Sequence, residues 1–115
     1  MKRDLDLVRA LLLALEECEN WVAVPKIDGV PGEVVAYHLQ LLIDAGYLVA
    51  AEKGRARVNY QSGYRLTWEG HELLDSARKK DRWQKAKGLV ESAGGVAFDV
   101  FKTLLTDLAK RELGL

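Results

Sequence analysis

The stretch EVVAYHLQLLIDAGYL, residues 33–48, decides the fold of this chain. Its apolar residues recur at the spacings of four and three that form one face of a helix: Val35, Leu39 and Leu42. Gly46 follows at the point where a chain leaves a helix through a left-handed residue, which glycine adopts without a side-chain penalty. Residues 47–49, YLV, then favour a strand, because aromatic and branched side chains suit a pleated surface.

The continuation to residue 74 predicts a returning strand and a new helix. Residues 64–66, YRL, are again strand-like, and the Thr67 hydroxyl can cap a helix that starts at Trp68. Gly70 lies in the first turn of that helix and should weaken it, so a glycine there indicates a close approach of another backbone segment. The order of helix, strand, basic loop, strand and helix is that of the second half of a winged helix-turn-helix domain.

Two motifs carry a resemblance to bacterial regulators. The pattern Leu66-Thr67-x-x-Gly70-x-x-x-Leu74 resembles the junction that closes their wing, and residues 38–48 resemble the end of a recognition helix with the strand that it feeds. More narrowly, the chain resembles the domain of unknown function 2513, a family of small winged-helix proteins common in bacteria and their prophages. The segments that carry this resemblance are residues 1–7, Tyr37-His38-Leu39, the block LTWEGHE at 66–72, Trp83 and residues 95–115. The resemblance implies a winged-helix fold and a bacterial or prophage source, but no activity.

The flanking segments complete an α+β, mainly helical chain, with a winged helix-turn-helix domain at 1–80 and a C-terminal helical extension at 81–115. We expect helices near 4–18, 32–45, 67–80 and 96–112, and strands near 47–52 and 62–66. A standard helix-turn-helix has a full helix where residues 19–32 lie, but both prolines and an Asp-Gly turn signal leave room only for one turn of helix or an extended piece. The helical pattern that starts at residue 68 continues to 87, with breaks expected at Gly88 and at Gly94-Gly95.

Composition and motifs favour a binding protein over an enzyme. The chain has 115 residues with 17 Lys plus Arg and 17 Asp plus Glu, so its formal charge of zero gives no overall attraction to nucleic acid or lipid. His38 and His71 lie on different predicted helices without a second ligand at metal spacing, and no phosphate loop or nucleophile motif is present. We therefore expect no catalytic residue, no cofactor and no metal. No stretch is long enough to span a bilayer, so we expect a cytoplasmic protein.

Two basic segments are candidate nucleic-acid contacts. The predicted wing, KGRARVNYQSG at 53–63, has no acid, and its candidate residues are Lys53, Arg55, Arg57 and Tyr60. A basic hairpin tip can grip a phosphate backbone, although charged tips also keep exposed hairpins from pairing at their edges. The second segment, RKKDRWQKAK at 78–87, has six basic residues against one acid, and its candidates are Arg78, Lys79, Lys80 and Arg82. A solvated helix face around Trp83 explains this segment at least as well.

The outward row of the helix at 32–45 argues against a simple major-groove model. Tyr37 could reach a phosphate and Gln40 could read adenine. Residues 27–52 nevertheless contain no Lys or Arg and have four acids: Asp28, Glu33, Asp44 and Glu52. Phosphates repel acids, so this row counts against insertion into the major groove. Two hypotheses therefore stay open. The protein is either a transcriptional regulator that binds double-stranded DNA through the two basic segments, which we favour, or an interaction module that binds another protein on the same scaffold.

The C-terminal helix predicts a further contact. Its apolar residues cover roughly half of the helix circumference: Ala97, Val100, Phe101, Leu104, Leu105 and Leu108. Such a surface must be covered, because exposing it costs about 25 cal/mol for each Å². The helix packs either back on the first helix of the chain, which would complete one core, or with one edge on its own domain and the other on a second copy, and the width of the arc favours a homodimer.

Overall fold

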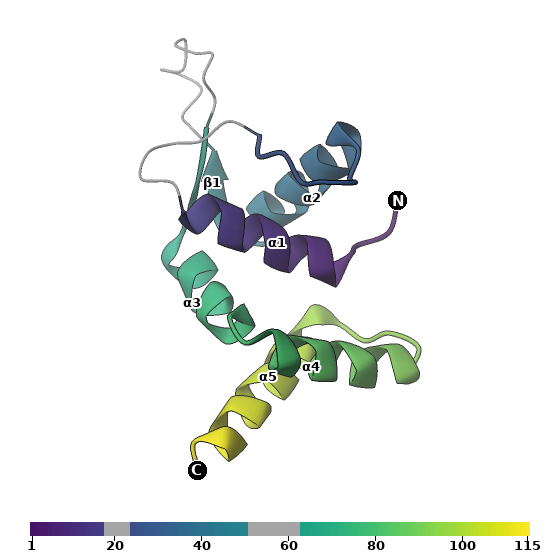
Figure 1. Ribbon diagram of the computed structural model, residues 1–115, viewed down its shortest axis with the longest axis vertical. Helices are drawn as coiled ribbons and strands as arrows, with labels where there is room; N and C mark the ends of the chain where they lie inside the picture. Colours follow the sequence, from purple (N-terminus) through teal and green to yellow (C-terminus); the bar gives the residue numbers. More distant parts are fainter. Residues whose placement is uncertain (18–23, 51–62) are drawn as a thin grey trace. The chain divides into compact units, whose positions relative to one another are not determined.

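The computed structural model describes residues 1–17, 24–50 and 63–115, and it is α+β and mainly helical, as the sequence predicts (Figure 1). Within these residues it has the helices α1 (Leu5–Glu16), α2 (Gly32–Asp44), α3 (Trp68–Ala77), α4 (Lys80–Ser92) and α5 (Phe98–Glu112), and the strands β1 (Leu48–Ala50) and β2 (Tyr64–Leu66). The expected helices at 4–18, 32–45, 67–80 and 96–112 correspond to α1, α2, α3 and α5. Residues 24–31 contain a turn at Asp28-Gly29 and no helix, and the rest of the segment before α2 lies outside the described residues.

The chain divides into two compact units, Met1–His71 and Glu72–Leu115. The division falls within α3, earlier than the domain boundary after residue 80 that the sequence suggests.

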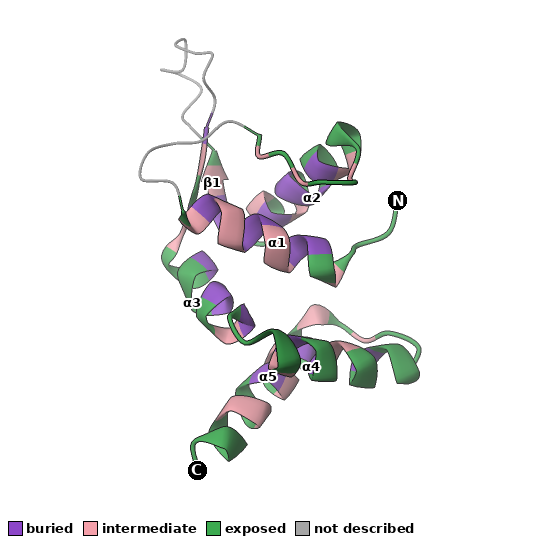
Figure 2. Ribbon diagram, in the orientation of Figure 1, coloured by how far each residue is buried: buried purple, intermediate pink, exposed green. Residues whose placement is uncertain are grey.

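The first unit is built around α1, which packs on α2 and β2, while α2 also packs on β1. Asp4 caps α1, since its Oδ1 accepts hydrogen bonds from the backbone N–H groups of Asp6 at 3.0 Å and Leu7 at 3.2 Å. Buried segments alternate with partly exposed ones along α1, and with partly and fully exposed ones along α2 (Figure 2), as amphipathic helices require. The core residues of this unit include Leu7, Val8, Leu11, Leu12, Leu15, Val35, Leu39, Leu42, Leu48 and Leu66.

The two strands pair antiparallel, with Leu48 opposite Leu66 and Ala50 opposite Tyr64. This pairing confirms the strand partners that the sequence predicts. The outer ends of the two predicted strands, residues 51–52 and 62, lie outside the described residues.

Thr67 ties the start of α3 to the turn that follows α2. Its backbone N–H donates to the Tyr47 carbonyl at 3.0 Å, and its hydroxyl donates to the Gly46 carbonyl at 2.6 Å while accepting from the Gly70 N–H at 3.0 Å. Gly46 has a φ of 86°, which confirms the predicted left-handed stop of α2. A β-carbon at Gly70 would lie closer than 3.0 Å to the Tyr47 carbonyl oxygen, so the predicted close backbone approach is also present.

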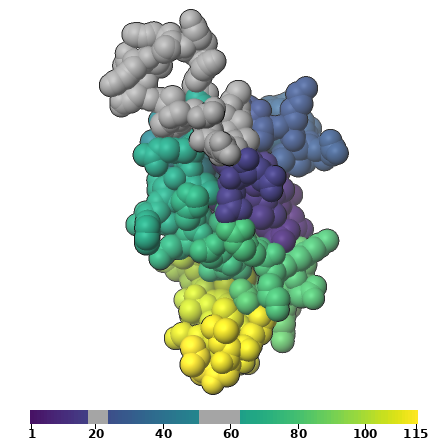
Figure 3. All heavy atoms as spheres, turned by 60° about the vertical axis from the view of Figure 1, so that its left-hand side comes forward, coloured from purple at the N-terminus to yellow at the C-terminus, as the bar shows by residue number. Residues whose placement is uncertain are grey.

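The second unit is built on the packing of α4 and α5, which touch in the space-filling view (Figure 3). Trp83 of α4 and Phe101 of α5 are both buried, and their rings meet edge to face at 4.8 Å between centroids. Leu105 of α5 is buried in the same chain. The centre of the apolar arc of α5 is therefore covered without a second copy, whereas Val100 on its edge is 47% exposed.

Two sequence predictions about this unit are wrong. The helix that starts at Trp68 does not continue to residue 87, because the chain becomes extended at Lys79, which precedes α4 with φ −81° and ψ 110°. On one continuous helix, Trp83 would lie about 180° around the axis from the buried Leu74. The break therefore allows both side chains to be buried.

The second wrong prediction is the helix break at Gly88, because this residue lies inside α4 and does not end the helix. A glycine inside a helix costs about 1 kcal/mol relative to alanine, which tertiary packing overrides here. The helix ends at Ser92, and the expected break at Gly94-Gly95 is present, with a φ of 83° at Gly94 and 97° at Gly95.

Candidate nucleic-acid interface

The candidate residues of the wing lie outside the described residues: Lys53, Arg55, Arg57 and Tyr60. What the structure describes is the frame that holds their segment. The pairing of Ala50 with Tyr64 fixes both ends of the connection, and the Thr67 hydrogen bonds hold the second strand against the end of α2.

The outward row of α2 is exposed as the sequence predicts, and comprises Glu33, Ala36, Tyr37, Gln40 and Asp44. Gln40 is not simply presented to solvent, because its Nε2 donates a 2.9 Å hydrogen bond to the Asp44 Oδ1 one turn later. The amide has a second N–H and an acceptor oxygen, so this bond restricts the orientation of Gln40 without removing the groups that could read adenine. The Tyr37 hydroxyl is the better candidate for a phosphate contact, since this side chain is 39% exposed.

His38 belongs to the inward face of α2 and is fully buried. Its Nε2 lies 2.8 Å from the Asp4 backbone nitrogen, which can only donate, so Nε2 accepts and the ring proton is on Nδ1. That Nδ1–H donates to the Val34 carbonyl at 2.9 Å. His38 therefore anchors the start of α1 on α2, a structural role that the sequence pattern alone does not reveal.

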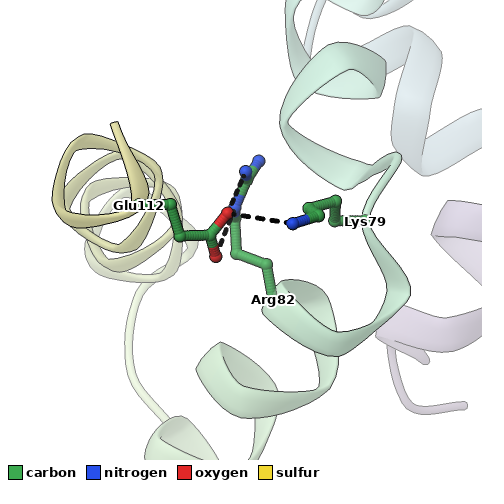
Figure 4. A network of polar contacts seen from close by, with 3 residues as sticks. All are labelled: Lys79, Arg82 and Glu112. Atoms are coloured by element: carbon green, nitrogen blue, oxygen red, sulfur yellow. Dashed lines mark hydrogen bonds and ion pairs between the residues drawn. The ribbon is translucent and has the colours of Figure 1, made fainter. Parts of the chain in front are cut away.

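The structure brings together two of the four candidates in the 78–87 segment, at a carboxylate on α5. Arg82 Nη2 lies 2.7 Å from Glu112 Oε1 and its Nε lies 3.5 Å from Oε2, so the guanidinium faces both oxygens. Lys79 Nζ lies 3.4 Å from the same Oε1 (Figure 4). Arg78 points elsewhere and pairs with Asp75 at 3.0 Å, and Lys80 is exposed.

Glu112 is the residue of this region that sequence reasoning missed. The hydrogen bond from Arg82 holds the pKa of Glu112 below its ordinary value, with the charges of Arg82 and Lys79 acting in the same direction and desolvation opposing them. A sequence signal for it existed. Glu112 is an acid in the last turn of a helix, where the helix dipole favours cations, and such a position suggests a specific basic partner.

Other kinds of site find little support in residues 1–17, 24–50 and 63–115. These residues contain no group of three His, Cys, Asp or Glu side chains that could hold a metal ion. No helix among them is both long and apolar enough to cross a membrane.

Comparisons with known proteins agree with the family that the sequence motifs indicate. Residues 2–97 match the model of a family described as "Hypothetical protein (DUF2513)". An uncharacterized protein of Haemophilus influenzae is 36% identical over 95 residues, which cover 80% of each chain. No solved structure matches the chain. The matched span contains the Thr67–Gly70 junction, the α2 row and the Lys79–Arg82 pair, whereas Glu112 lies beyond it. From these two matches, the chain belongs to the DUF2513 family.

Proposed function

We propose that this protein is a winged-helix regulator that binds double-stranded DNA mainly through phosphate contacts. The observation that carries the proposal is the antiparallel strand pair behind α2. It closes a connection that has Lys53, Arg55 and Arg57 but no acid between residues 53 and 63. Basic side chains on a hairpin tip next to an exposed helix suit the wing of a DNA-binding domain.

The charge of α2 sets the expected binding mode. Its exposed row includes Glu33 and Asp44 and no basic residue, and Gln40 is tied to Asp44. Deep insertion of this row among phosphates is therefore unfavourable. Affinity would come from the wing, from Tyr37 and from the 78–82 cluster (Arg78, Lys79, Lys80 and Arg82), which predicts weak sequence preference and steep salt dependence.

Fluorescence anisotropy with a labelled duplex across a salt series tests the proposal. Replacing Arg55 and Arg57 together by alanine should weaken binding and reduce the salt slope by about 1.8, since each lost phosphate contact removes about 0.9. The matched control is the double replacement of the exposed Lys2 and Lys26 by alanine, which removes the same charge from the same unit. Gln40→Ala should have a smaller effect than the wing variant. Absence of binding to any duplex at low salt would reject the regulator.

A protein-interaction module is the second candidate, and the surface of the first unit favours it. Trp68, at the start of α3, is 75% exposed, although burial of a tryptophan side chain is normally favourable. Together with the acidic row of α2, it would suit a partner with a basic and apolar surface. If the chain does not bind duplex DNA but a Trp68→Ala variant loses a partner that the wild type retains, the module replaces the regulator.

A further inference from the structure

A hollow of about 280 Å³ lies between α4 and α5 in the second unit. Its lining residues are Asp81, Arg82, Lys85, Leu108, Arg111 and Glu112. Three of these are cations and two are acids, and Lys79 adds a further cation through its contact with Glu112. The lining therefore has a small excess of positive charge even with Asp81 and Glu112 present, and loss of the Glu112 carboxylate would raise that excess by one charge.

The Arg82 guanidinium is the best-placed of these cations. Its side chain is only 14% exposed, and both its Nε and Nη2 face the two oxygens of Glu112. This forked geometry suits a phosphate as well as a carboxylate, because both present two oxygens in one plane. Lys79, with a side chain that is 65% exposed, approaches one of the same oxygens from the solvent side.

The Glu112 carboxylate itself is held by these cations at a position that its own helix disfavours. It lies in the last turn of α5, beside the negative end of the helix dipole. Its side chain is 41% exposed, so a soluble anion can reach it and the carboxylate can swing into water. An incoming phosphate would take over the contacts of Arg82 and Lys79 without any movement of the backbone.

We propose that Arg82 and Lys79, supported by Lys85 and Arg111, form a phosphate-binding site whose resident anion is the Glu112 carboxylate of the same chain. Phosphate binding and the Glu112 ion pairs are then mutually exclusive, and Glu112 limits the affinity of the site. Where the phosphate belongs to DNA, this inference rests on the proposed function and gives the 78–82 cluster a built-in competitor.

The exchange has a measurable consequence for salt dependence. When wild-type Glu112 is displaced by a phosphate, the released carboxylate attracts a cation from solution, which offsets part of the counterion release from the nucleic acid. The variant Glu112→Gln has no charge to compensate. It should bind a duplex more tightly, with a salt slope steeper by at most about 0.9, because one released carboxylate takes up no more than one cation.

The test compares Glu112→Gln with Asp107→Asn, which makes the same charge change at another exposed position of α5. Within the described part of the chain, Asp107 forms no ion pair with the cations of the hollow, so it reports the general effect of removing one acid from this helix. Adding Lys79→Gln to Glu112→Gln removes one phosphate contact, which should reverse most of the gain in slope. The second arm titrates inorganic phosphate against each full-length variant and follows the NMR signal of the Arg82 Nε–H.

The outcomes separate the two proposals. A steeper slope for Glu112→Gln than for Asp107→Asn, with an Arg82 signal that responds to phosphate at lower concentration, supports the inference for DNA. An Arg82 response without duplex binding by any variant supports a site for free phosphate and rejects the proposed function. Equal behaviour of the two variants in both arms overturns the inference, and it does so whether or not wild type binds DNA.

Discussion

The variant Gly70→Ala is expected to destabilise the protein at a helical position where alanine normally stabilises. Inside a helix, alanine is favoured over glycine by about 1 kcal/mol. Here the added β-carbon would lie closer than 3.0 Å to the Tyr47 carbonyl oxygen, a separation that real β-carbons essentially never show. It would also lie 3.1 Å from the Tyr47 carbonyl carbon and 3.3 Å from Leu66 Cδ2. The closest obstacle is backbone, so no side-chain rotation relieves it.

The cost follows from what must move. Moving α3 away from residue 47 would stretch the hydrogen bond that the Thr67 N–H donates to the Tyr47 carbonyl. It would also strain the hydrogen bond that the Thr67 hydroxyl donates to the Gly46 carbonyl. Overpacking costs about 1–3 kcal/mol, and a weakened hydrogen bond adds about 0.5–1.5 kcal/mol. After the gain in helix propensity of about 1 kcal/mol, the net destabilisation is about 0.5–3.5 kcal/mol.

Gly88→Ala is the matched control, because it makes the same change in the interior of α4, where a β-carbon would meet nothing within 4 Å. Urea unfolding followed by circular dichroism should show a lower midpoint for Gly70→Ala. For Gly88→Ala the midpoint should rise, by an amount that corresponds to a gain of up to about 1 kcal/mol in the free energy of unfolding. An equal rise for both variants would refute the close contact between Gly70 and Tyr47.

Three further outcomes are expected. Thr67→Val should lower the free energy of unfolding by about 0.5–2 kcal/mol in urea, because it removes the cap of α3 and the bond to Gly46, whereas Thr67→Ser should retain most of it; equal losses would contradict this role of the hydroxyl. The ion pairs of Glu112 should add stability that is complete above the ordinary glutamate pKa of about 4.3. Folding lowers the pKa of Glu112, so this contribution is lost as the pH falls through that lower value. The difference in melting temperature between wild type and Glu112→Gln should therefore shrink on acidification. A constant difference would argue against a stabilising role of these ion pairs. Light scattering across a dilution series should give the mass of a dimer that forms through the exposed edge of α5, which includes Val100. A monomeric mass at micromolar concentration would end this proposal, because Phe101 and Leu105 are already buried within one chain.

Local sequence signals were sufficient for the α2 to α3 region. The apolar spacing of Val35, Leu39 and Leu42 predicts the buried face of α2, and all three are buried. Gly46 and Gly70 predict a left-handed stop and a close backbone approach, and both are observed. These features depend on a few consecutive residues, so their physical cause is visible in the sequence itself.

Features that depend on distant partners could not be predicted in the same way. Residues 78–79 belong to a run of good helix formers, and only the burial of Trp83 and Leu74 in three dimensions requires the break there. The partner of Arg82 is Glu112, far along the chain on another helix, and no periodicity links them. The Gln40–Asp44 bond was different, since a spacing of four residues on a helix is a local signal for such a pair.

The neutrality of the chain is informative about how it could bind a polyanion. The chain has 17 basic and 17 acidic residues, and Arg78, Lys79, Arg82 and Lys87 each contact an acid. A nucleic acid would then replace internal carboxylates at these positions, whereas the wing sequence from 53 to 63 has no acid of its own. Because an exchanged ion pair contributes less net affinity than a newly formed one, the wing should dominate affinity at neutral pH. Protonation of Glu112 should free Lys79 and Arg82 of the 78–82 cluster, so their contribution to the binding free energy should increase. The loss of binding caused by Lys79→Gln should therefore grow on acidification. The loss caused by replacing Arg55 and Arg57 by alanine should stay nearly constant. Anisotropy measured at neutral and acidic pH distinguishes this from a uniform electrostatic effect, in which both losses would change in parallel.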